Sequence, residues 1–564
     1  MKPLPAVNNG FSGALIDGTE IVWLPLPRYD SSPVFAKLLD YDQGGTLSVD
    51  AKVLSQRYIV PNVLLTKIEQ GEIVDLMPQG EHALIRKIVC ERLKVFVQPT
   101  FNYALYKAVP KVLDERVVQF QNPQSSESIE VIFDFPSVRR LSKTTWEVQG
   151  SGYIYLTHIP DERFSVVKKL SAGLKHDIQS GFEKTLKYWK NKMRFSQNGD
   201  AYSTSVGVLL GLLFQPTGAV VASPTTSLPE VEGGERNWDY RFAWVRDSSI
   251  VAEALLSAGY IVEARKIIEF FLGLVSFTDK PFRYPLYRVD GTYPPPEREI
   301  EWLSGYSNSK PVRVGNAAAG QTQLDIEGFF MNALYKYYEL TRDSVFIKEN
   351  LDAIEHIANW EAKNWMLKDA SIWEERGVER HHTHSKAMVW VSLDRAGKLF
   401  SAIGEDDPWQ EERSKLREWI FENCTKDGRF VRYAGSFESD AALLSLPLYE
   451  FIDAKSEPFL KTFEHITQTL CVDGFVKRYT ADFLGEAKHP FTLTTLWYAR
   501  VLIRLGKTKE AIETIERVLK PSKGLYLVGE HVDVHTGEYT GNYPQAFSQA
   551  NVVLALDELR RLAR

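Results

Sequence analysis

The strongest constraint on the fold is an alternation of helical segments along the last two thirds of the chain. About twelve segments carry apolar residues at helical spacing and are separated by Gly, Pro and polar loops. After the first, the odd-numbered segments have charges on one face, as in ARKIIEFF and KEAIETIERV, which indicates a solvent-facing side. The even-numbered segments are apolar or small on most sides, as in MVWVSLDRA and FTLTTLWYA, which indicates burial. This alternation predicts two concentric rings of helices, a barrel of six helical hairpins. The predicted segments lie near residues 200–214, 247–258, 260–274, 323–341, 344–366, 385–402, 408–424, 437–451, 457–470, 490–505, 508–520 and 544–562.

Residues 1–165 have a different pattern, which predicts an antiparallel β-sandwich. Short runs rich in Val, Ile and aromatic residues are separated by turn sequences such as DGTE and NPQSS. The first helical segment, 200–214, is apolar, and we expect the β domain to cover it. The predicted strands are Glu20–Leu26, Lys52–Ile59, Ala83–Val89, Leu93–Val97, Ser128–Phe133 and Gly152–Thr157.

Between these regions, Val166–Arg194 is charged and amphipathic, which predicts a helical linker over residues 166–196. It has no Gly/Ser or Pro run, so we expect it to be rigid. The catalytic domain would then cover residues 197–564. A chain of 564 residues is too long for a single ordinary core, which agrees with more than one domain.

Net charge and composition limit the kinds of binding partner and the cellular location that we expect for this chain. A net charge of −6 argues against nucleic acid or an anionic membrane as a partner. The longest apolar run, Val206–Phe214, is far too short to span a bilayer. The first residues lack an apolar signal core, and the three cysteines are scattered, which together predict a cytoplasmic protein. The oligomeric state is open, and a homo-oligomer is compatible with the sequence.

Four polar and aromatic clusters precede even-numbered helical segments. Arg246-Asp247 opens the second segment, Trp373-Glu374-Glu375 precedes the sixth and Lys477-Arg478-Tyr479 precedes the tenth. Glu530, with Asn542 and Tyr543, precedes the twelfth. All inner helices of such a barrel run in the same direction, so the loops that enter them open on one face. The sequence therefore predicts that the four clusters meet at one end of the barrel.

The residue types in these clusters are those expected of a sugar-binding site. Aromatic rings stack on its C–H faces, and fixed charged groups bind its hydroxyls in pairs. Hydrolysis of a glycoside needs one protonated and one ionised carboxyl group on opposite sides of the bond. Glu374 follows Trp373, whose ring could shield it from water, and Glu530 comes from a distant loop. The alternative is that Arg246-Asp247 only caps a helix and that each glutamate is a solvated surface residue.

Three segments together resemble the prokaryotic branch of glycoside hydrolase family 15, which includes glucoamylases, glucodextranases and some trehalases. They are NWDYRFAWVRDSS, SIWEERGVERHHTHSKAMVWVSLDRA and GEHVDVHTGEYTGNYPQAFSQA. The N-terminal GALIDGTEIVWLPLPRYDSSPVFAKLLD resembles the opening of that branch, so the likeness extends over nearly the whole chain. It implies a β-sandwich, a helical linker and an (α/α)6 barrel. It also implies an inverting mechanism, which needs no cofactor or metal.

The resemblance also implies roles for individual residues. Glu374 matches the general acid and Glu530 the general base that activates water. Two positions depart from the family pattern: His531 follows the base where an acidic or amide residue is common, and Gln549 stands where His is frequent. The residues implied to bind substrate or line its pocket are Tyr240, Trp244, Arg246, Asp247, Trp373, Glu375 and Arg478.

The sequence thus predicts an inverting, exo-acting α-glucosidase that releases β-D-glucose from a small glucan, a maltooligosaccharide or trehalose. Two other functions stay open: a disaccharide phosphorylase, which would need a phosphate site but no general base, and a non-catalytic carbohydrate-binding protein. The run of His381, His382 and His384 is interpreted as a polar cluster at a helix entry, because no cysteine or second carboxylate set accompanies it.

Overall fold

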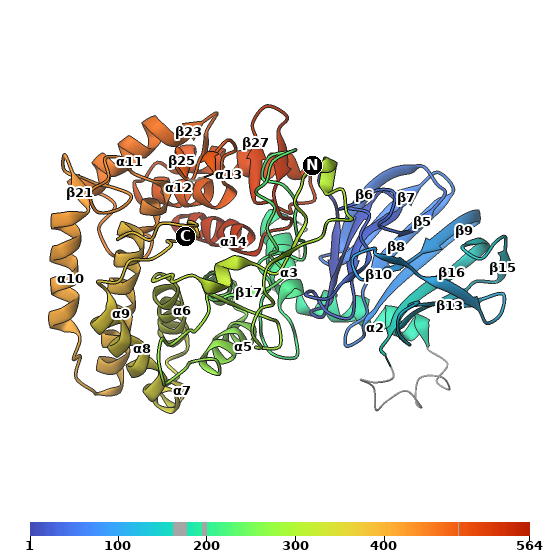
Figure 1. Cartoon of the computed structure of the whole chain (residues 1–564), viewed down its shortest axis with the longest axis horizontal. Helices are drawn as coiled ribbons and strands as arrows, with labels where there is room; N and C mark the ends of the chain where they lie inside the picture. Colours follow the sequence, from blue (N-terminus) through green and yellow to red (C-terminus); the bar gives the residue numbers. More distant parts are fainter. Residues whose placement is uncertain (162–176, 194–199, 483, 564) are drawn as a thin grey trace.

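The computed structural model describes residues 1–161, 177–193, 200–482 and 484–563. An N-terminal antiparallel sheet domain lies beside a larger helical domain (Figure 1). Those parts of the predicted linker that fall on residues 166–176 and 194–196 lie outside the described residues.

Fourteen strands form one sheet in which every pairing is antiparallel. Two long strands, β9 and β16, pair along most of their length, and β9 also pairs with β8 at one end and with β5 at the other. The strands of this sheet are β1 (Ala6–Asn8), β2 (Gly13–Asp17), β3 (Glu20–Pro25), β4 (Pro33–Phe35), β5 (Thr46–Val49), β6 (Val53–Val60), β7 (Val63–Ile68), β8 (Gly71–Leu76), β9 (Ala83–Gln98), β12 (Val109–Val112), β13 (Val117–Gln121), β14 (Ser128–Asp134), β15 (Ser137–Arg140) and β16 (Thr145–Ile159). A separate hairpin joins β10 (Thr100–Phe101) to β11 (Tyr106–Lys107).

The predicted strands are confirmed, with one correction. Ala83–Val89 and Leu93–Val97 were expected to be separate, but they are the two halves of β9. Cys90–Arg92 between them contains neither Gly nor Pro, so no turn interrupts the strand. Cys90 pairs with Gly150 of β16, and Glu91 and Arg92 lie at an irregularity in that pairing. Apolar side chains at alternate positions along the strands of this sheet pack into one cluster, which is the core of the sheet domain.

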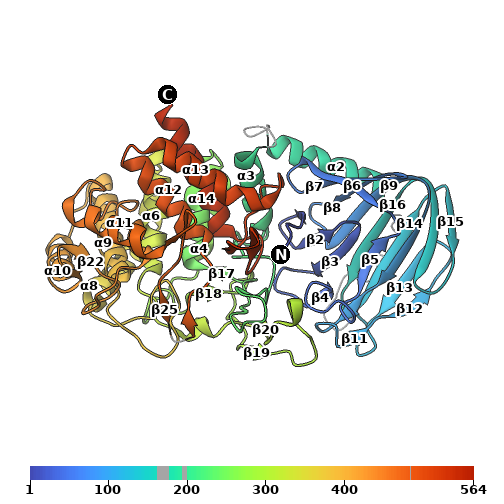
Figure 2. The ribbon, with the colours of Figure 1, turned by 90° about the horizontal axis from the view of Figure 1, so that it is seen from above.

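Helix α2 (Ile178–Lys192) is the part of the predicted linker helix that the structure describes. Asp177 caps it, because its carboxylate accepts a hydrogen bond from the Ser180 N–H. Ile178, Phe182 and Trp189 are buried, and α2 lies along the sheet (Figure 2).

The helical domain contains an inner ring that closes on itself. Around this ring, α4 packs on α6, α6 on α9, α9 on η4, η4 on α12, α12 on α14 and α14 on α4. The inner segments are α4 (Val245–Ser257), α6 (Ile326–Thr341), α9 (Thr383–Ile403), η4 (Ala441–Ser445), α12 (Thr492–Arg504) and α14 (Ala546–Leu562). The other helices of this domain are α3 (Ala201–Leu212), α5 (Ile261–Leu272), α7 (Ser344–Glu349), α8 (Leu351–Asn364), α10 (Gln410–Asn423), α11 (Glu457–Leu470) and α13 (Thr508–Leu519).

Two helix predictions need correction. The predicted helix 437–451 is only the short 3₁₀ helix η4, because Pro447 has no N–H to continue an α-helix. The predicted helix 344–366 is divided into α7 and α8 at Asn350. The Asn350 side chain donates to the Phe346 carbonyl oxygen, at 2.8 Å, and so competes with the helical backbone. The expected cover of α3 is confirmed, since Gly207 packs against Pro61 of the sheet domain.

Short hairpins and 3₁₀ turns fill the loops of the helical domain. Hairpins β17–β18, β19–β20 and β25–β26 lie on the same side of it (Figure 2). The hairpin strands are β17 (Ala243–Trp244), β18 (Leu286–Tyr287), β19 (Arg298–Glu299), β20 (Arg313–Val314), β21 (Thr425–Lys426), β22 (Arg429–Phe430), β23 (Cys471–Val472), β24 (Phe475–Val476), β25 (Ala481–Asp482), β26 (Gly485–Glu486), β27 (His531–Asp533) and β28 (Glu538–Thr540), and the remaining 3₁₀ helices are η2 (Tyr306–Asn308), η3 (Ala317–Gly320) and η5 (Lys520–Ser522). None of the helices in the described part of the chain is long and apolar enough to cross a membrane.

A buried arginine joins the two domains. Arg241 donates to both carboxylate oxygens of Asp239, at 2.9 and 2.8 Å, and also to the Ser31 carbonyl oxygen and the Tyr103 hydroxyl of the sheet domain. Arg241 and Asp239 are both fully buried.

Arg241→Ala should therefore lower the free energy of unfolding by about 3–5 kcal/mol, because it leaves the Asp239 carboxylate buried without its partner. Urea denaturation measures the loss. The matched control is Arg139→Ala, which removes the ion pair of an exposed arginine with Glu147 and should cost about 1 kcal/mol or less. Equal small losses in the two variants would contradict this role for Arg241.

Candidate active site

One cavity lies where the loops preceding the inner helices gather. Eight of the nine predicted site residues line it: Tyr240, Trp244, Arg246, Asp247, Trp373, Glu374, Arg478 and Glu530. Glu375 does not line this cavity; its carboxylate pairs instead with Arg432, so a direct contact with substrate hydroxyls finds no support there.

The first turn of α4 supplies Arg246 and Asp247. The Arg246 guanidinium donates to Asp325 Oδ2 at 2.9 Å and to Gln323 Oε1 at 3.0 Å, which fixes its orientation. Its other terminal nitrogen donates to Glu374 Oε1 at 2.9 Å. Burial raises the pKa of Asp247 to about 7 although Arg246 opposes the shift, so near neutral pH this group can both accept and donate hydrogen bonds.

Glu374 lies in the loop before α9 in a strained backbone conformation. Its φ is +57°, in the left-handed region that non-glycine residues rarely adopt. Its Oε1 accepts hydrogen bonds from Trp244 Nε1 and from Arg246, each at 2.9 Å. Since both donors bind the same oxygen, Oε2 has no hydrogen-bond donor among the described residues.

Glu530 lies in the loop before α14 and is almost completely buried. Its Oε1 accepts a hydrogen bond from the Tyr240 hydroxyl at 2.7 Å, and its Oε2 accepts one from the Asn542 N–H at 3.1 Å. Burial raises the pKa of Glu530, and the nearby Glu230 carboxylate raises it further. Tyr240 and Arg478 act in the opposite direction because both stabilise the ionised form.

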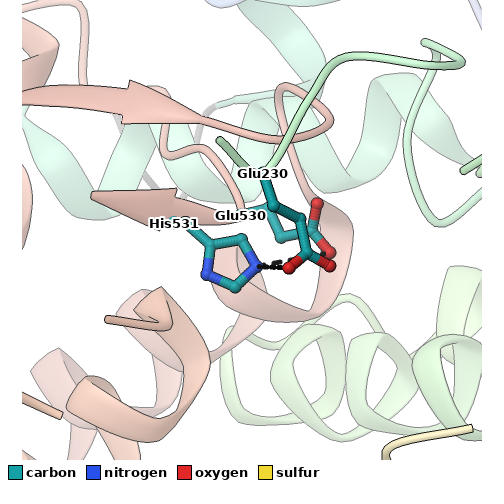
Figure 3. Close-up of side chains that lie close together, drawn as sticks. All are labelled: Glu230, Glu530 and His531. Carbon is teal, nitrogen blue, oxygen red and sulfur yellow. Dashed lines mark ion pairs between the residues drawn. The ribbon is translucent and has the colours of Figure 1, made fainter. Parts of the chain in front are cut away.

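Glu230 and His531 complete the surroundings of Glu530. Their side chains and that of Glu530 point toward one another (Figure 3). His531 Nε2 lies 3.7 Å from Glu230 Oε2 and 3.9 Å from Glu530 Oε1. Burial lowers the pKa of His531 to about 3, so the ring is neutral. Its Nδ1 lies 3.2 Å from the Pro490 carbonyl oxygen, which can only accept, so Nδ1 carries the ring proton.

Aromatic rings form much of the cavity wall. Trp373 donates its indole N–H to Asp440 Oδ2 at 2.7 Å and packs edge-on against Tyr479, with ring centroids 5.8 Å apart. Tyr240 and Trp244 are also edge-on, with centroids 5.5 Å apart. These two rings carry the donors to Glu530 and Glu374, so they connect the two carboxylates across the cavity.

Comparison with known families agrees with this geometry. The model of glycosyl hydrolases family 15 matches residues 196–557, which is more than half of the chain.

The chain belongs to glycosyl hydrolases family 15. It is therefore a glycoside hydrolase. A second family model, trehalase-like, N-terminal, matches residues 3–130 in the sheet domain.

Relatives of this family 15 hydrolase align with it over nearly the whole of both chains. Trehalase 1 of Sulfolobus acidocaldarius is 52% identical over 573 residues, covering 100% of this chain and 99% of that protein. A trehalase of Thermoplasma volcanium is 31% identical, covering 96% of this chain and 90% of that protein. The crystal structure of a bacterial glucoamylase complexed with acarbose has a TM-score of 0.73 at 14% identity, covering 99% of this chain and 94% of that one, which shows a shared fold.

Three important residues of this hydrolase were not predicted. Asp325 and Asp440 precede α6 and η4, so they follow the same rule as the predicted clusters, and all six inner segments contribute to the site. That rule could have found them. Glu230 lies in a long loop with no periodic pattern, and only its contacts in the structure reveal it.

One group in the described part of the chain could offer three ligand atoms to a metal ion, namely Glu230, Glu530 and His531. Arg478 already donates to both oxygens of Glu230, at 2.5 and 3.3 Å, and supplies the positive charge that this carboxylate needs. We therefore assign no metal to this group.

The remaining predicted features have structural positions. His382 and Thr383 begin α9, which confirms the helix-entry interpretation of the histidine run. Gln549 lies outside the cavity lining; its Oε1 accepts a hydrogen bond from the Val528 N–H, so it holds the loop segment that leads to Glu530.

Proposed function

We propose that this hydrolase is an inverting, exo-acting α-glucosidase whose substrate is trehalose. The observation that carries the proposal is that Glu374 and Glu530, two carboxylates from distant loops, line the same cavity. Full-length similarity to proteins named trehalase, at 52% and 40% identity, supports trehalose as the substrate over longer glucans.

In this mechanism Glu374 is the general acid. Its hydrogen bonds from Trp244 and Arg246 hold Oε1, and the proton on Oε2 passes to the glycosidic oxygen as the bond to the anomeric carbon breaks. The leaving glucose departs with that proton. An inverting pair leaves room for one water, so its carboxyl groups should be about 6.5–9.5 Å apart.

Glu530 is the general base. It takes a proton from the water that attacks the anomeric carbon on the face opposite the leaving group, and inversion follows. Tyr240 and the Asn542 N–H orient the carboxylate. Arg246 and Asp247 hold the hydroxyls of the terminal glucose unit whose anomeric carbon is attacked, so cleavage occurs at the bond next to that unit. Glu375 acts indirectly in this proposal, through its pairing with Arg432.

A phosphorylase and a non-catalytic binding protein fit the cavity less well. A phosphate dianion that approached the anomeric carbon would be repelled by the carboxylates of Glu230 and Glu530, whereas a neutral water molecule would not be repelled. A binding protein would not need two opposed carboxylates.

The proposal also includes an interpretation of the fold and of the cellular location. We interpret the closed inner ring as an (α/α)6 barrel with η4 as a shortened member, and the branched sheet as a β-sandwich. Domain boundaries near residues 165 and 196 are part of this interpretation. All three cysteines are free, which supports a reducing compartment such as the cytoplasm.

Product analysis tests the function. The protein should convert trehalose to glucose at the same rate with and without phosphate, and it should release no glucose 1-phosphate. Release of glucose 1-phosphate would favour the phosphorylase, and binding without turnover would favour the non-catalytic protein.

The pH dependence of kcat/KM tests how the neighbours of Glu530 shift the pKa of this proposed base. Glu530 must be ionised, and its pKa is raised, so kcat/KM should rise as the pH increases through this pKa. Glu230→Gln removes a neighbouring negative charge, lowers the pKa of Glu530 and should move this acidic limb to lower pH by about one unit. The exposed neighbour Glu232 gives the control, Glu232→Gln, whose profile should match the wild type. A Glu230→Gln profile that does not move would contradict the assignment of the acidic limb to Glu530.

A further inference from the structure

The carboxylate of Asp369 binds three separate segments of the chain near the active site. Asp369 is fully buried and lies in the loop between α8 and α9 that also carries Glu374. Its Oδ2 accepts hydrogen bonds from the Leu324 N–H at 3.2 Å, the Ser371 N–H at 3.1 Å and the Ser385 hydroxyl at 2.7 Å. Because Ser385 lies in the first turn of α9, the carboxylate attaches two loops to one of the inner helices.

The first of these loops leads from Asp369 to the backbone of Glu374. Ser371 and Glu374 have φ angles of +61° and +57°, so this short turn contains two residues in a conformation that non-glycine residues rarely adopt. The Glu374 N–H donates to the Ser371 carbonyl oxygen at 3.1 Å. A strained turn persists only where its surroundings hold it, and the bond from the Ser371 N–H to Asp369 holds the beginning of this one.

The second loop leads from Asp369 to the side chain of Glu374. Leu324, whose N–H Asp369 binds, directly precedes Asp325. Asp325 accepts a hydrogen bond from Arg246 at 2.9 Å, and Arg246 donates to Glu374 Oε1 at 2.9 Å. Asp369 therefore supports both the backbone of Glu374 and the arginine that orients its carboxyl group.

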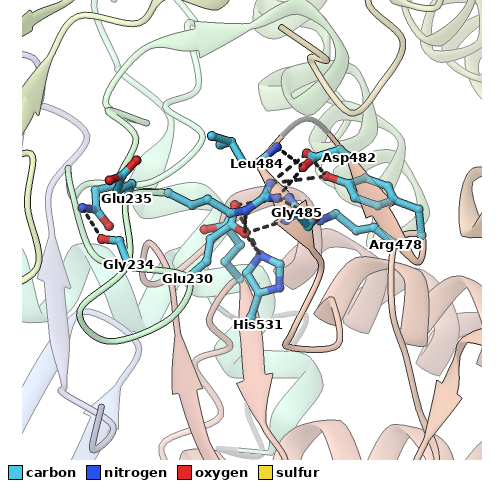
Figure 4. Close-up of polar contacts among 12 residues, drawn as sticks. Glu230, Gly234, Glu235, Arg478, Asp482, Leu484, Gly485 and His531 are labelled. Carbon is cyan, nitrogen blue, oxygen red and sulfur yellow. Dashed lines mark hydrogen bonds and ion pairs between the residues drawn. The ribbon is translucent and has the colours of Figure 1, made fainter.

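The proposed base has a different set of supports. Glu530 accepts a hydrogen bond from Tyr240, and its neighbour Glu230 is bound by Arg478 (Figure 4). None of these four residues belongs to a segment that Asp369 binds. A change at Asp369 is therefore expected to act on the acid and not on the base.

We propose that Asp369 is a positioning residue for the general acid. By binding both loops to α9, it holds the carboxyl group of Glu374 where its proton reaches the glycosidic oxygen. This inference rests on the proposed role of Glu374 and adds the residue that keeps it in place. Asp369 does not line the cavity, so it acts through Glu374 and not through contact with the substrate.

Asp369→Ala tests this inference through the ratio of kcat for trehalose to kcat for α-glucosyl fluoride. Trehalose needs the proton of Glu374, whereas fluoride departs without one, so lost positioning should lower this ratio by about tenfold or more. A general loss of structure would lower both rates equally and leave the ratio unchanged.

Asp369→Asn is the conservative variant. It keeps the shape of the side chain and an oxygen that accepts hydrogen bonds. Because those bonds are weaker without the negative charge, the ratio should fall by a smaller factor of about three. This variant decides the matter if Asp369→Ala does not fold.

Asp40→Ala is the matched control in the sheet domain. Asp40 is also buried, and its carboxylate likewise accepts three hydrogen bonds, from the N–H groups of Asp42, Gln43 and Ser304. Its loss removes a comparable support far from Glu374 in the sequence, so the ratio should equal that of the wild type.

A wild-type ratio in folded Asp369→Ala, or in Asp369→Asn if the alanine variant does not fold, would overturn the inference. An equal fall of the ratio in the Asp40→Ala control would also overturn it. Failure of the wild type to hydrolyse trehalose, or an unchanged ratio in Glu374→Gln, would instead overturn the proposed function.

Discussion

Glu374→Gln should lower kcat for trehalose by about 10²-fold or more, because an amide cannot donate the proton that the leaving oxygen needs. The substitution keeps the shape of the side chain, and its amide oxygen can still accept from Trp244 and Arg246. Substrate binding should therefore change little. Steady-state kinetics on trehalose measure both quantities.

A substrate whose leaving group needs no protonation makes this test specific to the acid role. α-Glucosyl fluoride has a leaving group that departs without protonation, so Glu374→Gln should hydrolyse it at close to the wild-type rate. Glu379→Gln, an exposed glutamate in the same loop, is the control and should be fully active on both substrates. Trehalose hydrolysis at the wild-type rate by Glu374→Gln would remove the residue from the mechanism.

Glu530→Gln should lower kcat by a similar factor of about 10² or more, for a different reason. Water must lose a proton as it attacks, whatever the leaving group is. Glu530→Gln should therefore be inactive on both trehalose and α-glucosyl fluoride. The contrast between the two variants separates the acid from the base.

The opposite contrast would reverse the two roles. If α-glucosyl fluoride restored the rate of Glu530→Gln but not of Glu374→Gln, Glu530 would be the acid. The raised pKa of Glu530 makes this comparison informative, because burial favours its protonated form, whereas the donors from Tyr240 and Asn542 favour the ionised form.

Much of the helical domain could be predicted because its signal is local. Periodicity and charge located nearly every helix, and the order of buried and exposed helices placed Arg246, Glu374 and Glu530 at one cavity. The errors arose where a single side chain or missing N–H altered the backbone. Asn350 divides one predicted helix, and Pro447 shortens another to a 3₁₀ turn.

The finer parts of the site depend on contacts between distant loops. Glu375 is next to Glu374 in sequence, but the turn at Glu374, with φ of +57°, separates their directions, and Glu375 pairs with Arg432. Glu230 lies far from Arg478 and His531 in sequence, and no periodic pattern connects them. The ion pair between Arg236 and Asp482 likewise exists only when the two loops that carry them meet.

The most direct test of the account is the anomeric form of the glucose first released from trehalose, followed by NMR before mutarotation. Trehalose contains two α-linked glucose units. Inversion at the attacked carbon gives one β-glucose, and the leaving unit keeps its configuration and appears as α-glucose. The account therefore predicts equal initial amounts of α- and β-glucose. Initial release of α-glucose alone would show retention of configuration and would contradict the roles proposed for Glu374 and Glu530.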